Sequence, residues 1–228
     1  MTMKRLLPLL AMFPAVTFMF MGVGAFMGVD AACAQVEKTF QRTDSNGQAV
    51  QTPYVTYEEF RSVTLCFPDG RVPLRKLLTV SSLDEAVRLL GDPQSIERNE
   101  DPDDASFTAW LHYGRDTTVE YHGFADGTLG LTSIELRSSK WGLEIGDKEL
   151  SPGMDITGLD DTVRQSAVSG TFSKKKDKSG LGTIYIASPN ASKNGKIEPL
   201  MNGMTQFNFN TRETGTIDVV RLSRIVSN

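Results

Sequence analysis

Two histidines and a glutamate lie close together in the sequence: His112, Glu120 and His122. Imidazole and carboxylate groups bind zinc and act as general bases. Alternating strands on either side of a turn at Gly114–Asp116 would place the two imidazoles about four residues apart along the ladder, roughly 13 Å. Zinc ligands lie about 2 Å from the metal, so both histidines cannot reach one ion. We therefore expect two solvent-facing histidines and no metal site.

Cys66 is the one cysteine that remains after an export signal is removed, and it is a candidate nucleophile. A catalytic thiol needs a base and a group that orients the base, and no Cys-His-Asn spacing suggests them. Motifs of serine hydrolases, zinc proteases and phosphate-binding loops are also absent from the sequence. We expect a buried structural cysteine, with an intermolecular disulfide as the alternative, and neither catalytic residues nor a cofactor. The protein is predicted not to be an enzyme.

Three polar stretches carry weaker predictions. Carboxylates cluster in Glu97–Asp104, but their spacing lacks the glycine of a calcium loop, so a solvated connecting loop is favoured over a calcium site. The run Lys174–Lys178 indicates an exposed hairpin tip rather than a contact for an anionic surface. Gln206, Asn208 and Asn210 alternate along one strand face, and such amides can bind sugars, although a polar strand face needs no ligand.

The remaining candidate is a binding surface. Trp110 would share a strand face with His112 and Glu120. A tryptophan among polar neighbours is typical of an interface anchor, whereas a sheet covered on both sides would make Trp110 part of the core. Trp110, His112 and Glu120 are therefore the predicted binding residues.

These residues need a scaffold, and the sequence predicts a short helix followed by strands. Ser82 and Glu85 form a capping pattern, and Gly91 and Pro93 end the helix. A second capping pattern at Thr56–Glu59 predicts one helical turn. A strand is expected over Val63–Phe67, followed by a turn at Pro68–Gly70. Four further segments with alternating or apolar residues are also expected to be strands: Phe107–Tyr113, Thr117–His122, Leu129–Leu136 and Trp141–Ile145. A three-residue turn would place Leu111 opposite Val119.

The same order of elements recurs in the second half. A helix is expected over Ile156–Ser166, and strands are expected over Thr183–Ala187, Thr205–Thr211 and Thr216–Val226. Aligning Leu83 with Leu159 predicts an internal duplication. The expected fold is α+β, with two tandem units that each pack a short helix on an antiparallel β-meander. The units span residues 54–150, with an N-terminal hairpin, and 151–228.

The helix ending Leu90-Gly91-x-Pro93, the strand with Trp110 and Tyr113, and the entry Pro152-Gly153-Met154 resemble the SmpA/BamE-type and β-lactamase-inhibitor-like helix-plus-meander repeat. The chain departs from that pattern because its first unit lacks the Gly-Met entry and its second lacks Gly-x-Pro. The resemblance implies a non-catalytic module that binds proteins in the cell envelope or outside the cell, and it transfers no functional residue.

The N-terminus determines the expected location. Lys4 and Arg5 precede an uncharged run, Leu6–Val29, and the sequence Ala32-Cys33-Ala34 ends in a signal-peptidase pattern. We expect residues 1–34 to be a cleaved signal peptide, with an uncleaved anchor or lipidation of Cys33 as alternatives. Residues 35–53, polar and poor in apolar side chains, are predicted to be a flexible linker. The mature chain would then be periplasmic or secreted.

The composition narrows the classes of molecule that this chain is expected to bind. The chain carries 24 Lys and Arg against 28 Asp and Glu, without a basic stripe, which argues against nucleic acid. Membrane contact is expected only through the N-terminal segment, if it is retained. The sequence thus predicts an exported, non-catalytic protein-binding or envelope-assembly module. The alternatives are a small extracytoplasmic hydrolase and a glycan-binding module.

Overall fold

The structure is a computed structural model of the chain, and it describes residues 38–43, 47, 49–146, 148–159, 180–188, 199–200, 206–212, 215–224 and 226. All of them belong to the second of two units into which the chain divides, Ala34–Asn228, and only this unit is described. The predicted signal peptide lies outside these residues. Among the described residues, no helix has the length and apolar character needed to cross a membrane.

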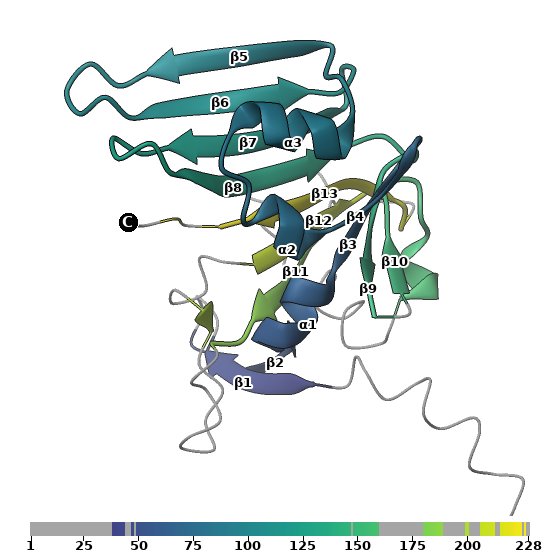
Figure 1. Cartoon of the computed structure of the whole chain (residues 1–228). Coiled ribbons are helices and arrows are strands. Elements are labelled where there is room, and N and C mark those ends of the chain that lie inside the picture. The colour runs from purple at the N-terminus through teal and green to yellow at the C-terminus, as the bar shows by residue number, and fades with distance from the viewer. Residues whose placement is uncertain are drawn as a thin grey trace, which may run out of the picture. The chain divides into compact units, whose positions relative to one another are not determined.

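The main element is a nine-stranded sheet with the order β1-β2-β11-β12-β13-β8-β7-β6-β5 (Figure 1). Its neighbouring strands are antiparallel except for β2 and β11, which run parallel. The strands are β1 (Thr39–Thr43), β2 (Ala49–Val55), β5 (Ser95–Glu100), β6 (Phe107–His112), β7 (Thr117–Gly123), β8 (Leu129–Leu136), β11 (Gly180–Ile186), β12 (Gln206–Thr211) and β13 (Ile217–Ser223).

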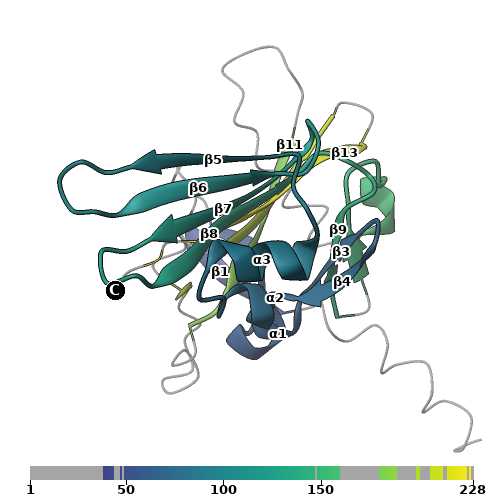
Figure 2. The same ribbon diagram turned by 45° about the horizontal axis from the view of Figure 1, so that its top comes forward.

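A four-stranded sheet and three short helices complete the described fold. The small sheet has the order β10-β9-β3-β4, and its strands are β3 (Thr64–Phe67), β4 (Gly70–Pro73), β9 (Gly142–Ile145) and β10 (Lys148–Leu150). The helices are α1 (Tyr57–Ser62), α2 (Leu74–Leu77) and α3 (Leu83–Leu90), and a 3₁₀ turn, η1, covers Ile156–Gly158. The two views place α1, α2 and α3 on the same side of the large sheet (Figures 1 and 2).

Capping explains where two of these helices begin. At α1, the Glu59 amide donates to Thr56 Oγ1 at 3.2 Å and the Thr56 amide donates to Glu59 Oε2 at 2.7 Å, which confirms the predicted capping box. At α3, the Glu85 amide donates to Ser82 Oγ, as predicted, but the Glu85 carboxylate accepts from the amide and hydroxyl of Ser81 instead of reaching Ser82. Gly91 ends α3 with a φ of 83°, in the region that favours glycine.

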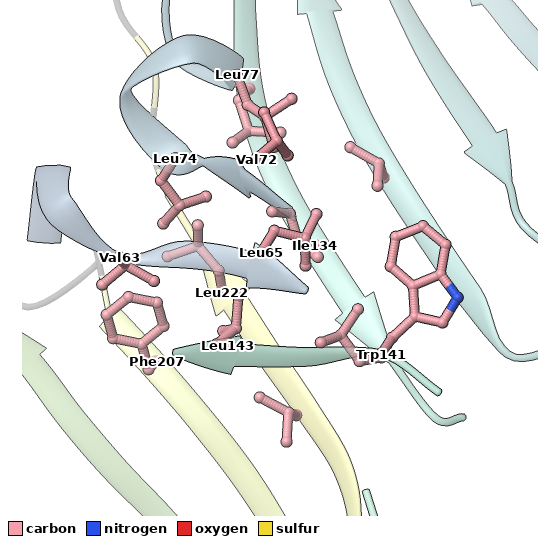
Figure 3. Close-up of a cluster of buried hydrophobic side chains, with 14 of the residues drawn as sticks. Val63, Leu65, Val72, Leu74, Leu77, Ile134, Trp141, Leu143, Phe207 and Leu222 are labelled. Atoms are coloured by element: carbon pink, nitrogen blue, oxygen red, sulfur yellow. The ribbon is translucent and has the colours of Figure 1, made fainter. Parts of the chain in front are cut away.

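The core lies between one face of the large sheet, called here the inner face, and the layer of helices and small sheet. Ile134, Phe207 and Leu222 come from the large sheet, Leu65 and Leu143 from the small one, and all are fully buried. Figure 3 shows these side chains together with others from β4 and α2 in one cluster. On the opposite, outer face, alternate residues of the same strands are mostly half-buried or exposed.

The predicted fold class is wrong. The described chain is mainly β, and it does not form two tandem helix-on-meander units. Strands from residues 54–150 and from residues 151–228 share the large sheet, where β8 pairs with β13. The strand predicted at Trp141–Ile145 leaves the meander, because β9 pairs with β3 in the small sheet. In the second half, η1 occupies the start of the predicted helix, and residues 160–166 lie outside the described residues.

Two predicted loops contain strands. The predicted linker over residues 35–53 contributes β1 and much of β2, which form an edge hairpin of the large sheet. The predicted connecting loop Glu97–Asp104 begins within β5, which pairs with β6 over its whole length. Both segments are polar, and edge strands need few apolar side chains, so hydrophobic alternation does not reveal them.

Candidate functional site

The hairpin of β6 and β7 brings the three predicted binding residues to the outer face. Trp110 pairs directly with Glu120, and His112 pairs with Thr118. The predicted register, with Leu111 opposite Val119, is confirmed. It puts Leu111 and Val119 in the core and leaves Trp110, His112 and Glu120 half-buried. The alternative of a fully buried Trp110 is therefore wrong.

Trp110 lies between two carboxylates. Glu97 of β5 pairs with it on one side and Glu120 of β7 on the other. Glu97 keeps 70% of its side chain exposed, whereas Glu120 Oε2 accepts a hydrogen bond from Ser133 Oγ at 3.1 Å. The indole ring therefore lies between the exposed carboxylate of Glu97 and the carboxylate of Glu120, which is held by a hydrogen bond. We call Glu97, Trp110, His112 and Glu120 the Trp110 patch.

His112 is fixed within this patch. Its Nδ1 lies 3.2 Å from Thr118 Oγ1, and its Nε2 lies 3.6 Å from Glu97 Oε1. Nε2 is buried and has no hydrogen-bond partner in the described structure. A protonated imidazole would form an ion pair with Glu97, whereas a neutral one leaves that carboxylate available to a ligand.

His122 does not join His112. It pairs with Thr108, two positions beyond the Trp110–Glu120 pair, and its ring makes an edge contact with Phe124 at 4.6 Å between centroids. The register therefore separates the two imidazoles as the sequence predicts. Within the described residues, no three His, Cys, Asp or Glu side chains are grouped so that they could hold a metal ion.

Cys66 lies in β3 of the small sheet and is half-buried, so the prediction of a buried cysteine is wrong. Its Sγ is 3.8 Å from Glu144 Oε2, and the same carboxylate oxygen accepts from Arg71 at 3.0 Å. Burial raises the pKa of the Cys66 thiol, and the charges of Glu144 and Glu149 act in the same direction, against the opposing effect of Arg71. A nucleophilic cysteine needs a lowered pKa, so this environment disfavours the reactive thiolate.

The other polar stretches have local structural explanations where they are described. Asp101 Oδ1 and Asp104 Oδ1 accept turn hydrogen bonds from the amides of Asp103 and Ser106, each at 2.9 Å. Asn208 accepts from Thr183 Oγ1 at 3.0 Å on the outer face. The Lys174–Lys178 run lies outside the described residues.

The outer face also holds an ion-pair network. Glu135 of β8 accepts from Arg137 Nε at 2.7 Å and, across the sheet, from Arg221 of β13. Burial alone would raise the pKa of Glu135, but hydrogen bonds from both guanidinium groups outweigh it and lower that pKa. This network joins the two halves of the chain at the β8–β13 pair.

Sequence reasoning missed a cleft of about 570 Å³. It is lined by the β3–β4 turn, the segment after α3, the β6–β7 turn and the segment before β9. Phe67, Tyr113 and Trp141 form its aromatic wall, with ring centroids 5.5 Å apart for Phe67 and Trp141 and 5.1 Å apart for Tyr113 and Trp141. The first three of these segments are separately recognisable as turns, but their convergence depends on pairings between distant strands.

Comparisons with known protein families, with curated proteins and with solved structures find no match. The resemblance to the SmpA/BamE-type repeat therefore stays a prediction.

Proposed function

We propose that this chain is an exported, non-catalytic binding module whose Trp110 patch docks a protein of the cell envelope or of the extracellular space. The observation that carries the proposal is the position of Trp110. Its indole is half-buried on the outer sheet face, between Glu97 and Glu120. Aromatic side chains in such mixed surroundings are frequent anchors of protein interfaces.

The charges of the patch indicate what the partner presents. A basic side chain placed over the indole would gain a cation–π contact and would lie near the carboxylates of Glu97 and Glu120. Glu120 is held in place by Ser133, so part of the patch is ordered before binding. The patch therefore favours a partner with an exposed arginine or lysine at its contact surface.

Two further observations support a non-catalytic role outside the cytoplasm. The raised pKa of Cys66 opposes nucleophilic catalysis by the thiol. The charged start, apolar run and Ala32-Cys33-Ala34 pattern of the N-terminus are those of an export signal. Export would place the Trp110 patch among envelope or extracellular proteins.

Site-specific photo-crosslinking tests the proposal in the producing cell. A photoreactive residue at Thr118, beside the patch, should give a covalent adduct with one protein. The same residue at Arg71, an exposed position on the small sheet, serves as the matched control and should not give that adduct. Adding Trp110→Ala to the Thr118 probe should reduce the yield by at least about tenfold, as expected for an interface anchor.

The isolated pair then tests the chemistry. Replacing Glu97 and Glu120 by Gln should weaken binding and reduce its dependence on salt, because both carboxylates contribute to attraction of a basic group. Circular dichroism would confirm that each variant is folded. An adduct that forms equally from Thr118 and Arg71, or that is unaffected by Trp110→Ala, would refute the proposed docking surface.

A further inference from the structure

We infer that the cleft beside Trp141 is a second binding site and that it takes a short neutral oligosaccharide. This site is separate from the Trp110 patch: it opens at one end of the strands, whereas the patch lies on the outer face of the large sheet. Its volume of about 570 Å³ lies within the range of roughly 300–1,000 Å³ that is usual for small-molecule sites.

The indole of Trp141 supplies a hydrogen-bond donor in the lining of the cleft. Only 6% of Trp141 is exposed, yet no acceptor in the described part of the chain receives a hydrogen bond from its Nε1–H. Figure 3 shows the indole nitrogen turned away from the aliphatic cluster. Trp141 Nε1 is not a buried unpaired donor: it is accessible to solvent, and a molecule bound in the cleft can replace water as its acceptor.

The aromatic wall is fixed in advance. The ring of Tyr113 contacts Trp141, and its hydroxyl donates to the Gly91 carbonyl at 3.2 Å, which ties the β6–β7 turn to the end of α3. Phe67 also contacts Trp141, and the two rings stack with an interplanar angle of 29°. A rigid apolar wall suits the C–H faces of sugar rings, because little side-chain entropy is lost on binding.

The polar lining matches hydroxyl groups, which both donate and accept hydrogen bonds. Asp92 and Asp116 supply acceptors, Arg115 and Lys140 supply donors, and Gln94 supplies both. No ion pair among the described residues involves Asp92, Asp116, Arg115 or Lys140. With Asp69, the lining has three acidic and two basic side chains, so its near balance favours a neutral ligand over a strongly charged one.

Fluorine NMR of the full chain carrying 5-fluorotryptophan tests this inference. The chain has two tryptophans, Trp110 and Trp141, and Trp110→Phe and Trp141→Phe would assign their resonances. The probes are maltotetraose, cellotetraose, chitotetraose and mannotetraose. The zwitterionic dipeptide Gly-Phe is tested separately and represents an alternative class of ligand. At least one tetrasaccharide should shift the Trp141 resonance saturably and leave the Trp110 resonance unchanged.

Matched variants locate the binding. In calorimetry with that tetrasaccharide, Trp141→Phe keeps an aromatic ring but removes the N–H, and should weaken binding about fivefold, the effect of one lost hydrogen bond. Arg115→Ala should weaken it similarly, whereas Trp110→Phe should leave the affinity unchanged. Binding should also be insensitive to salt, since the ligand is neutral.

Several results would overturn the inference. They are the absence of a saturable shift with all four sugars in a folded protein, a response to Gly-Phe alone, and sugar binding that survives both Trp141→Phe and Arg115→Ala. The Trp110 resonance reports on the protein-docking proposal separately, because a partner at the Trp110 patch would move that resonance instead. Failure of one proposal is thus distinguishable from failure of the other.

Discussion

The two faces of the nine-stranded sheet are built from alternate residues of the same strands, yet they differ in almost every property. On β13, Val220 and Leu222 point to the inner face and are fully buried, while Arg221 and Ser223 point to the outer face and are half-buried. The inner face is covered by helices and a second sheet, and the outer face bears the Trp110 patch and the Glu135 network. One-residue alternation along the strands thus separates the residues of the buried core from those of the proposed binding surface.

The largest predicted effect tests this separation on adjacent residues. Leu222→Ala should lower the free energy of unfolding by about 2–5 kcal/mol, because it leaves a cavity in the core. Ser223→Ala, one residue away on the outer face, should change it by only about 0.5 kcal/mol or less. Urea unfolding followed by circular dichroism measures both. Similar losses for the two variants would show that the outer face is as important for stability as the inner one.

Two glycines of the inner face allow a sharper test. Gly182 pairs with Phe209 and Gly123 with Phe107, and each ring lies over its glycine. A Cβ at Gly182 would come within 1.9 Å of the Phe209 ring, and a Cβ at Gly123 within 2.0 Å of the Phe107 ring. Rings that cover glycines in this way protect the backbone where the strand has no side chain.

The two sites differ in whether the ring can move. Phe209 is fully buried, whereas Phe107 is only half-buried and faces the guanidinium of Arg98, 3.6 Å from its centroid. Gly182→Ala should therefore destabilise the protein by about 1–3 kcal/mol, and Gly123→Ala by less, since Phe107 can swing outward. Thermal unfolding of both variants compares them. An equal or larger loss at Gly123 would contradict this account of the inner face.

The sequence predicted β6, β7 and β8 well because apolar residues recur along each of them. The β6–β7 register and the bounds of β8 are confirmed, since Leu111, Val119 and Ile134 can be buried together in only one register. The caps of α1 and α3 are also local patterns, and their main hydrogen bonds are as predicted. These features depend on residues that lie near one another in the chain.

The assembly of the strands could not be predicted in the same way. The pairing of β3 with β9 joins Cys66 to Gly142, and that of β8 with β13 joins Leu136 to Val220. Local periodicity contains no information about which distant strands meet. Trp110, His112 and Glu120 could be placed on one face because they lie within one hairpin. Glu97 was expected in a loop, and the cleft beside Trp141 was missed because four separated segments form it.

A small effect is predicted for the Glu135 network, which gives the outer face a structural role. Hydrogen bonds from Arg221 and Arg137 lower the pKa of Glu135 below its usual value of 4.5, despite burial, which would raise it. A carboxylate with a lowered pKa in the folded state stabilises the protein above its unfolded pKa, and this contribution disappears as the pH falls through the folded pKa. Glu135→Gln should therefore cost about 1 kcal/mol or less near neutral pH.

The pH dependence distinguishes this network from simple packing. The difference in melting temperature between the wild-type protein and Glu135→Gln should be constant above about pH 6 and should shrink below about pH 4.5, as the wild-type carboxylate becomes protonated. Glu97→Gln, on the same face and 70% exposed, corrects for the general effect of removing one negative charge. If the difference instead persists unchanged at low pH, Glu135 acts through its shape, and the ion pairs between β8 and β13 add nothing to the stability of the outer face.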